Sequence, residues 1–392
     1  MEDEVIDKLV VNSKKQFDWA EQFKKHRYLY EELKDIDPSY YLGIKGVRGI
    51  GKTVLMLQIA RETDDSIYFS ADSTLVQPYD LYEVVKALER RGYENIFVDE
   101  IHRKAGWDQD VKTLYDEHQV RLIFSGSSAI DITKTGADLS RRVVMKRLKP
   151  ASFREFLNLR KGYSIPPMSL ETILENRKEL SRKHADVHPL WKEYVRYGGV
   201  MYPKKGFFDA FENSLRKVVM QDLEALRQTN VKYETDAFKL LHLIARSPPF
   251  ETNYSKIAND LDVSKNFAIR LVSDLEKAGV VKPVLPCKKK GVNVKKEPKI
   301  YLRTPVRKFF EHEGVDVKVG ALREEFFANH AEEICYMKGG RGEKTADFRY
   351  KGTVIEVGGP GKSAYQDPEY IAVDGLSTEG KKIPLFLFGF LY

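Results

Sequence analysis

The sequence predicts an α/β protein built on a parallel sheet, with further helical and α/β parts behind it. Two observations indicate this class. In the first 150 residues, short apolar runs alternate with helical patterns, which favours parallel strands joined by right-handed crossovers. The chain also has 392 residues, 42% of them hydrophobic, so it is long enough for two to four domains with their own cores.

The elements follow in order along the chain. Residues 1–36 are expected to form polar helix with an apolar stripe of Phe17, Ala20 and Phe23. The expected strands of the sheet are Tyr40–Ile44, Ile67–Ser70, Ile96–Val98 and Arg121–Phe124, and the expected helices are Val54–Arg61, Asp80–Arg91 and Gln109–Glu117.

The remaining two thirds of the chain shows three patterns. Residues 150–230 are mostly helical, residues 235–303 form a helical unit with one hairpin, and residues 315–392 contain a helix followed by strands. The expected strands there are Ala346–Tyr350, Thr353–Val357 and a final apolar strand, Pro384–Phe390. We therefore place the parts at 1–150, 151–232, 233–312 and 313–392.

Composition excludes several classes of protein. Two cysteines, Cys287 and Cys335, are too few for a disulfide scaffold or a cysteine zinc finger, and the eight histidines lack metal-ligand spacing. No apolar run reaches the ~20 residues that cross a bilayer, and the first residues are acidic. We expect a soluble, cytoplasmic protein without a membrane partner. Its net charge of +7 permits an anionic partner.

A glycine-rich turn between the first strand and the first helix of the sheet carries the clearest chemistry. It matches G-x-x-x-x-G-K-[ST] and comprises Gly46, Val47, Arg48, Gly49, Ile50, Gly51, Lys52 and Thr53, followed by Val54. Glycines let backbone N–H groups surround a phosphate, and the helix N-terminus adds partial positive charge. We expect these residues to bind ATP or ADP, with Lys52 on the β- and γ-phosphates and Thr53 on Mg²⁺.

Two carboxylates end a later apolar strand. Asp99 and Glu100 follow Ile96–Val98, in the position where such a site holds its metal and its catalytic base. Asp99 is expected to hold Mg²⁺ and Glu100 to polarise the attacking water, which favours hydrolysis over nucleotide holding alone.

Polar groups after the next strand supply further catalytic candidates. Ser125 ends the strand Arg121–Phe124 and can sense the γ-phosphate, or belong to an ordinary Ser-Gly turn. Arg141 and Arg142 follow, and either can act on the nucleotide of a neighbouring subunit, or be a solvated charge pair.

The sequence resembles the archaeal and bacterial AAA+ ATPases that carry a C-terminal DUF4143-type region. The matching segments are Tyr28-Leu29, Gly46–Thr53, Asp99–His102 with Trp107, Ser125–Ser128, Leu148–Phe156 and Tyr194–Gly199. The resemblance implies a P-loop ATPase core, a helical lid, a winged helix and a restriction-nuclease-like C-terminal domain. It places the arginine finger on Arg142, but Arg141 stands where a small residue is usual.

Residues 235–303 can also be interpreted without the family. Ser264 suits the N-cap of a helix whose buried face is Ala268, Leu271, Val272 and Leu275. The opposite face carries Asn266, Ile269, Arg270 and Ser273, with Lys265 beside it, and is small, polar and basic, as a reader of the DNA major groove needs to be.

The following hairpin is strongly basic. Residues 282–303 contain eight lysines and arginines against one acid, Glu297. Five of the lysines, Lys288, Lys289, Lys290, Lys295 and Lys296, fall in its loop and invite contacts with DNA phosphates. We expect binding to double-stranded DNA with little sequence reading. Winged helices that bind proteins are the alternative.

The C-terminal part contains acids that resemble the D…E-x-K signature of restriction-like nucleases. They are Asp347 and Glu356, preceded by Glu325 on a helix. Gly358 stands where the lysine belongs, and Lys362 lies four residues later. Such acids hold Mg²⁺ in nucleases, and the missing lysine favours a relic over an active enzyme.

Together these patterns predict an ATPase, using ATP and Mg²⁺, that couples nucleotide state to DNA binding or remodelling and assembles into a homo-oligomer, with a hexameric ring as one form. A slow nucleotide-controlled switch of the STAND type and an ATP-dependent DNA nuclease are the alternatives.

Overall fold

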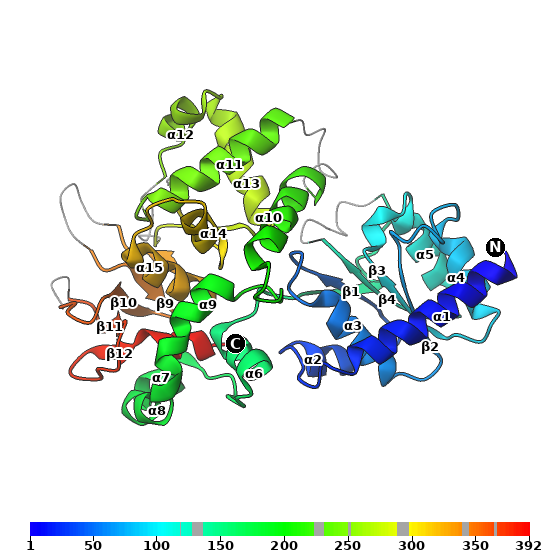
Figure 1. The fold of residues 1–392 in the computed structure, drawn as a ribbon, viewed down its shortest axis with the longest axis horizontal. Coiled ribbons are helices and arrows are strands. Elements are labelled where there is room, and N and C mark those ends of the chain that lie inside the picture. The colour runs from blue at the N-terminus through cyan, green and yellow to red at the C-terminus, as the bar shows by residue number, and fades with distance from the viewer. Residues whose placement is uncertain are drawn as a thin grey trace. The chain divides into compact units, whose positions relative to one another are not determined.

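The computed structural model describes residues 1–117, 119–127, 136–222, 231–249, 252–287, 298–338, 345–363 and 367–392. It divides into two compact units, an N-terminal unit of Met1–Lys149 and a C-terminal unit of Pro150–Tyr392 (Figure 1). This division lies one residue from the boundary that the sequence places at 150. The finer boundaries at 232 and 312 stay predictions.

The N-terminal unit is built on a five-stranded sheet in which every neighbouring pair is parallel. Its strands, in spatial order, are β2 (Ser66–Ser70), β3 (Asn95–Asp99), β4 (Arg121–Gly126), β1 (Tyr41–Lys45) and β5 (Val143–Arg147). The α/β class is therefore confirmed. The expected strands did not include β5, although it begins with the apolar residues Val143, Val144 and Met145. It lies at the edge of the sheet, and of its residues only Val143 is fully buried.

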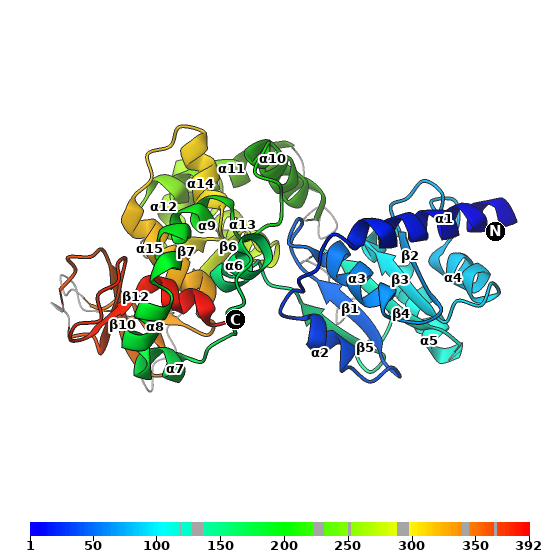
Figure 2. The ribbon, with the colours of Figure 1, turned by 60° about the horizontal axis from the view of Figure 1, so that its bottom comes forward.

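Helices cover both faces of this sheet. They are α1 (Asp3–Ala20), α2 (Tyr30–Lys34), α3 (Lys52–Arg61), α4 (Leu81–Glu89), the 3₁₀ turn η1 (Ile101–Arg103) and α5 (Trp107–Glu117). The crossover from β1 to β2 runs opposite to that from β2 to β3, so right-handed connections place α3 and α4 on opposite faces. Helix α1 packs beside α3 and β2, whereas α4 packs against α5 (Figure 2).

The buried stripe of α1 differs from the one expected. Ile6, Leu9 and Ser13 are buried, and the Ser13 hydroxyl oxygen accepts a hydrogen bond from the Tyr68 backbone N–H at 2.9 Å. Phe23 lies beyond the helix and is 37% exposed. Of the expected stripe, Ala20 is buried and Phe17 is half-buried. The expectation is wrong at Phe23, whose ring packs on the exposed ring of Trp19 with the centroids 4.9 Å apart.

The C-terminal unit begins with helices. They are α6 (Phe153–Lys161), α7 (Leu170–Glu175), α8 (Arg177–Lys183), the 3₁₀ segment η3 (Ala185–Leu190), α9 (Trp191–Tyr197), α10 (Phe207–Lys217) and a π-helical turn, η4 (Val218–Asp222). Three helices and an antiparallel hairpin follow: α11 (Val231–Arg246), α12 (Tyr254–Leu261), α13 (Lys265–Lys277), and β6 (Val281–Val284) paired with β7 (Lys299–Leu302).

A second five-stranded sheet closes the chain. Its order is β12 (Lys382–Pro384), β11 (Tyr370–Val373), β10 (Thr353–Gly358), β9 (Phe348–Tyr350) and β8 (Cys335–Tyr336), preceded by α14 (Val306–His312) and α15 (Val319–His330). Helix α15 packs against β10, as both ribbon views show (Figures 1 and 2). The expected final strand is wrong: Leu385–Phe390 is a 3₁₀ helix, η6, and its apolar run reflects burial on all sides instead of a pleat.

One hydrophobic cluster joins the first helices of the C-terminal unit, α15, the hairpin and the second sheet. Phe153 of α6 contacts the rings of Tyr194, Phe326 and Phe390, which come from α9, α15 and η6. The same core includes Val284 and Tyr301 of the hairpin. Segments that the sequence assigned to three parts therefore share one hydrophobic interior.

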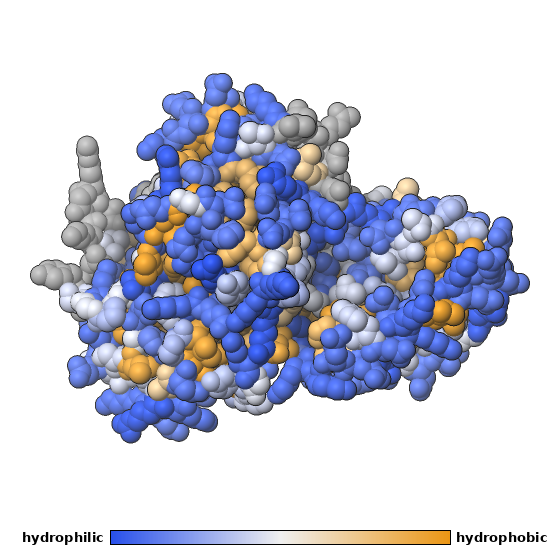
Figure 3. Space-filling model, in the orientation of Figure 1, coloured by the Kyte–Doolittle hydropathy of each residue, from blue (hydrophilic) through white to orange (hydrophobic). Residues whose placement is uncertain are grey.

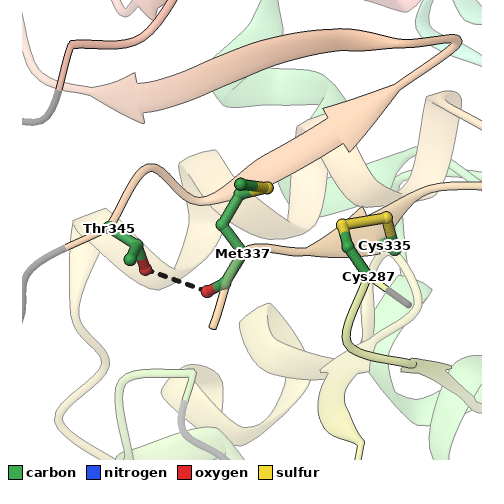
Figure 4. The surroundings of a disulfide bond; sticks show 4 residues. All are labelled: Cys287, Cys335, Met337 and Thr345. Atoms are coloured by element: carbon green, nitrogen blue, oxygen red, sulfur yellow. Dashed lines mark hydrogen bonds between the residues drawn. A yellow bond between two sulfur atoms is a disulfide. The ribbon is translucent and has the colours of Figure 1, made fainter. Parts of the chain in front are cut away.

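A disulfide between Cys287 and Cys335 joins the hairpin to the second sheet across 48 positions of sequence (Figure 4). Backbone hydrogen bonds reinforce the junction, because the N–H of Cys287 donates to the Tyr336 carbonyl oxygen and the N–H of Tyr336 donates to that of Leu285. The sequence excluded a disulfide scaffold but did not predict this single bond.

The surface in view is mostly hydrophilic, broken by small hydrophobic patches (Figure 3). Within the described residues, no helix combines the length and apolar character that a membrane span requires.

Candidate functional site

The glycine-rich turn connects β1 to α3, in the frame that the sequence predicted. Gly49 and Gly51 have φ of 78° and 95°, a left-handed backbone that favours glycine. At Gly46, a Cβ atom would lie 2.7 Å from the carbonyl oxygen of Leu148, so no side chain fits there. Lys52 is 6% exposed, and its Nζ donates to the carbonyl oxygens of Gly46 at 2.9 Å and Val47 at 3.3 Å.

Arg27 supports the turn from outside, and sequence reasoning missed it. Its guanidinium is buried and donates to the carbonyl oxygens of Ile50 and, at 2.7 Å, Lys149. The arginine therefore ties the turn to the end of the N-terminal unit. The only signal in the sequence was its place beside the Tyr28-Leu29 match.

Asp99 is the centre of the site. It is 4% exposed, and its Oδ2 accepts hydrogen bonds from the hydroxyls of Thr53 at 2.6 Å and Tyr68 at 2.9 Å. Its Oδ1 accepts from the Ser125 hydroxyl and, at 3.1 Å, from the Glu100 backbone N–H. Strand β4 lies between β1 and β3, which brings Ser125 to this carboxylate. Burial and then the Asp99 charge raise the pKa of Tyr68, so this phenol remains a donor.

The oxygen atoms of Thr53 and Asp99 are suitable ligands for a magnesium ion. Mg²⁺ prefers oxygen ligands and is commonly held by one or two protein oxygens together with phosphates and water. The Thr53 hydroxyl and the Asp99 carboxylate are 2.6 Å apart and provide such a pair. Among the described residues, no group of three His, Cys, Asp or Glu side chains forms that could hold a metal ion by itself.

Glu100 has an unusual backbone. Its φ of 52° is left-handed, an uncommon conformation for a non-glycine residue that is often found at functional sites. Its backbone N–H also donates to the Ser125 hydroxyl oxygen at 3.2 Å, and its Oε2 lies 3.5 Å from His102 Nδ1.

His102 is a second residue whose environment the sequence did not reveal. Both its ring nitrogens are buried and lack a hydrogen-bond partner. Burial, and then the charges of Arg103, Arg48 and Lys52, lower the pKa of His102 to about 4, so the imidazole beside Glu100 is neutral near pH 7.

Comparison with known proteins agrees with this geometry. The family model described as an AAA domain matches residues 39–157, which span the turn, Asp99 and Ser125. "Uncharacterized protein MJ1637" of Methanocaldococcus jannaschii is 30% identical over 355 residues, covering 83% of this chain and 74% of that protein.

The chain belongs to this AAA-domain family. "Uncharacterized protein MJ1544" of the same organism is 27% identical over 57% of this chain and 49% of that protein, so the chain spans only about half of this second relative. A solved RuvB of Thermotoga maritima covers 78% of this chain and 95% of that chain at 14% identity, but its TM-score of 0.29 is too low to support a conclusion. Because the family model matches residues 39–157, the N-terminal unit is an AAA+ P-loop domain, a nucleotide-binding class of fold.

The two arginines that the sequence offers as an arginine finger, Arg141 and Arg142, differ in their surroundings. Arg142 Nε lies 2.8 Å from Asp116 Oδ1, and its Nη1 donates to the Asp138 carbonyl oxygen at 2.8 Å. The Arg141 side chain is 86% exposed, and its guanidinium lies 3.7 Å from the carboxylate of Asp138. Arg142 is held within its own unit, whereas Arg141 reaches solvent.

The expected DNA-contacting residues are only partly within the described structure. Lys265, Asn266 and Arg270 are exposed on α13, and Ile269 is 41% exposed beside them. The Ser264 hydroxyl oxygen caps the helix by accepting from the Phe267 N–H at 3.2 Å, and the predicted apolar face is buried. Lys288, Lys289, Lys290, Lys295 and Lys296 lie outside the described residues.

The acids of the C-terminal sheet meet as the sequence predicted, with one correction. The Asp347 N–H donates to Glu356 Oε2 at 3.1 Å. Glu325 lies elsewhere, because its carboxylate accepts from Arg307 Nε and Nη2, each at 2.8 Å, and from the Leu302 N–H. Its neighbour on the helix, Glu324, is the acid near Asp347: burial, followed by the Asp347 charge, raises the pKa of Glu324 to about 8.

Lys362 lies where the missing lysine was expected. A Cβ atom on Gly358 would come within 2.6 Å of Lys362 Cγ, so the lysine chain crosses directly over the glycine. Lys362 Nζ lies 2.5 Å from Glu356 Oε1. Burial acts to lower the pKa of Lys362, but the hydrogen bond and charge of Glu356 outweigh it and raise the pKa. The glycine thus leaves room for a lysine from the next turn.

Proposed function

We propose that the protein is an ATPase that binds and hydrolyses Mg–ATP in its AAA domain and couples nucleotide state to its grip on double-stranded DNA. The observation that supports the ATPase assignment is the hydrogen bond between Thr53 and Asp99, which joins two oxygen groups of the kind that ligate magnesium at the end of the glycine-rich turn.

Each residue of the AAA site has a role in this proposal. Lys52 leaves the carbonyl oxygens of the turn and donates to the β- and γ-phosphates. Bound Mg²⁺ supplies charge stabilisation to the transferring phosphoryl group. Glu100 accepts a proton from the attacking water, and its fixed backbone orients the carboxylate for that step. Ser125 holds both Asp99 and the Glu100 N–H.

We further propose a homo-oligomer in which an arginine acts on the neighbouring subunit. Arg141 suits this role better than Arg142, because it is exposed and need not leave the contacts that hold Arg142. In a closed ring, every nucleotide site has a neighbouring subunit that can supply this arginine, because a ring has no end.

DNA binding is proposed for the region of α11–β7, interpreted as a winged helix. The support is the exposed face of Lys265, Asn266 and Arg270 together with the five lysines of the hairpin loop.

The ATPase proposal is tested with Lys52→Ala. We expect loss of ATP binding in a direct binding measurement, with thermal unfolding of the free protein little changed. Since Lys52 makes only two backbone hydrogen bonds in the structure, its removal should spare the fold. ATP affinity equal to that of the wild type would contradict the site.

The position of Lys362 favours phosphodiester hydrolysis as a second candidate activity. Glu324, Asp347 and Glu356 provide acids, and Lys362 provides the cation that the sequence alone left missing. Incubation of supercoiled plasmid with Mn²⁺ or Mg²⁺ should then produce nicked circles, and Asp347→Asn and Lys362→Gln should each abolish nicking. Equal nicking by Asp347→Asn, or none by the wild type, would reject this activity.

A further inference from the structure

A pocket of about 350 Å³ lies between α11 and the turn that joins α12 to α13. Lys232, Tyr233 and Asp236 of α11 line one side, and Asp262, Ser264 and Phe267 line the other. The three helices lie together in both ribbon views (Figures 1 and 2). Its volume is at the small end of the range for ligand sites.

Asp236 is the unusual member of this lining. It is 2% exposed, and its Oδ2 is buried without a hydrogen-bond partner. Among the described residues, the cation that pairs with Asp236 is Lys239, whose Nζ lies 4.0 Å from Oδ1 and whose side chain is 58% exposed. A buried carboxylate oxygen without a donor is costly and is rarely kept without a use.

Asp274 shows how a buried aspartate in the same helical group is normally satisfied. It is 3% exposed, and its Oδ2 accepts a hydrogen bond from the Tyr233 hydroxyl at 3.0 Å. Within the described residues, two aspartates of similar burial therefore differ: Asp274 has an internal donor for its Oδ2, and Asp236 has none. A bound molecule can supply that donor.

The residues that line the pocket indicate which kind of ligand could donate to Asp236. Tyr233 and Phe267 present two rings whose centroids lie 5.8 Å apart at 74°. Asp262, in the turn, adds a second carboxylate. Carboxylates with aromatic faces suit an organic cation, which pairs with the acids and packs against the rings.

We propose that this pocket binds a small organic cation through a primary ammonium or guanidinium group, with Asp236 as its buried counter-charge. The carboxylate reaches the ligand by rotating about χ2, a soft torsion in aspartate. Ser264 and Lys232 line the same pocket and offer a hydroxyl and a cation to any polar tail of the ligand. This inference does not depend on ATP hydrolysis or on DNA binding.

The test uses the full-length protein with agmatine, which carries both cationic groups, and putrescine, which carries only ammonium groups. Calorimetric titration should show saturable one-to-one binding of at least one of them, and 1,4-butanediol should not bind. Asp236→Asn should weaken binding at least tenfold. It should not lower the unfolding temperature of the free protein, because it removes a buried charge whose pairing cation, Lys239, is 4.0 Å away and exposed.

Two further variants keep the test decisive. Asp274→Asn, the matched control, should bind the amine within threefold of the wild type. Asp262→Asn should weaken binding several-fold, and it serves if Asp236→Asn does not fold, because asparagine tolerates the left-handed φ of 54° at this position. The proposal is overturned if neither amine binds the wild type at millimolar concentration, or if binding survives unchanged in the Asp236 or Asp262 variant.

Discussion

At the scale of single residues, Asp99 organises the AAA site. Its two carboxylate oxygens accept four hydrogen bonds, from Thr53, Tyr68, Ser125 and the Glu100 N–H. The sequence predicted Thr53, Asp99, Glu100 and Ser125 from motif and strand order. It could not predict Tyr68, Arg27 or His102, because their roles depend on side-chain packing that has no fixed spacing in the chain.

The role of Glu100 leads to the first prediction. Glu100→Gln should bind ATP within a few-fold of the wild type but hydrolyse it about 10²–10⁴ times more slowly, because an amide cannot accept the proton. Single-turnover hydrolysis of radiolabelled ATP measures this directly. Glu94→Gln, the same change at an exposed position, is the control and should hydrolyse normally. Wild-type turnover in Glu100→Gln would show that another group is the base.

The raised pKa of Glu324 leads to a prediction for stability. A carboxyl whose pKa rises on folding binds more protons in the native state, so its contribution to stability is lost as pH increases. Glu324 has an ordinary value of 4.5 and a folded value of about 8. Between pH 5 and pH 8 in EDTA, the wild type should therefore lose more stability to urea than Glu324→Gln. Parallel pH profiles for the two proteins would contradict the buried position of this acid.

At the scale of elements, prediction succeeded where a pattern was local. Strands β1 to β4 and the buried face of α13 follow from apolar spacing, and Ser264 caps α13 as its residue type predicts. Prediction failed where burial came from distant segments. Edge strand β5 has a short apolar run but little burial, and the apolar run of η6 is surrounded by a core that α6, α9 and α15 also build.

Contacts with α15 and with the second sheet hold the hairpin β6–β7 in place. The disulfide and the Tyr336 backbone bonds fix Cys287, and Lys282 Nζ donates to the carbonyl oxygens of Ala328 and, at 2.7 Å, Ala331. Lys282 therefore makes its contacts within the fold and is not one of the proposed DNA contacts. In the proposed interface, the basic residues are those of the loop and of α13.

The loop lysines give a prediction at this scale. Replacing Lys288, Lys289, Lys290, Lys295 and Lys296 with alanine should weaken duplex binding and flatten its salt dependence, by about 0.9 in logarithmic slope for each DNA phosphate that is no longer neutralised. Fluorescence anisotropy at several salt concentrations measures both effects. A control with alanine at five exposed lysines elsewhere in the same unit, Lys178, Lys183, Lys192, Lys205 and Lys217, removes the same charge. An equal decrease of slope in the two variants would remove the loop from the interface.

At the scale of the whole molecule, the chain combines an AAA+ domain with a larger C-terminal unit, in which one hydrophobic cluster joins the hairpin to the second sheet. In the proposed cycle, cleavage of ATP in the first unit changes how the second holds DNA, as rigid units commonly move against each other in nucleotide-driven proteins. In that cycle the hairpin moves together with α6–α9, α15 and the second sheet, because these elements share one hydrophobic cluster.

The most direct test of this coupling is the affinity of the wild type for a labelled duplex, measured with a non-hydrolysable ATP analogue, with ADP and without nucleotide. We predict at least a fivefold difference in duplex affinity between the analogue and ADP, which disappears in Lys52→Ala. The same affinity in all three states would contradict it.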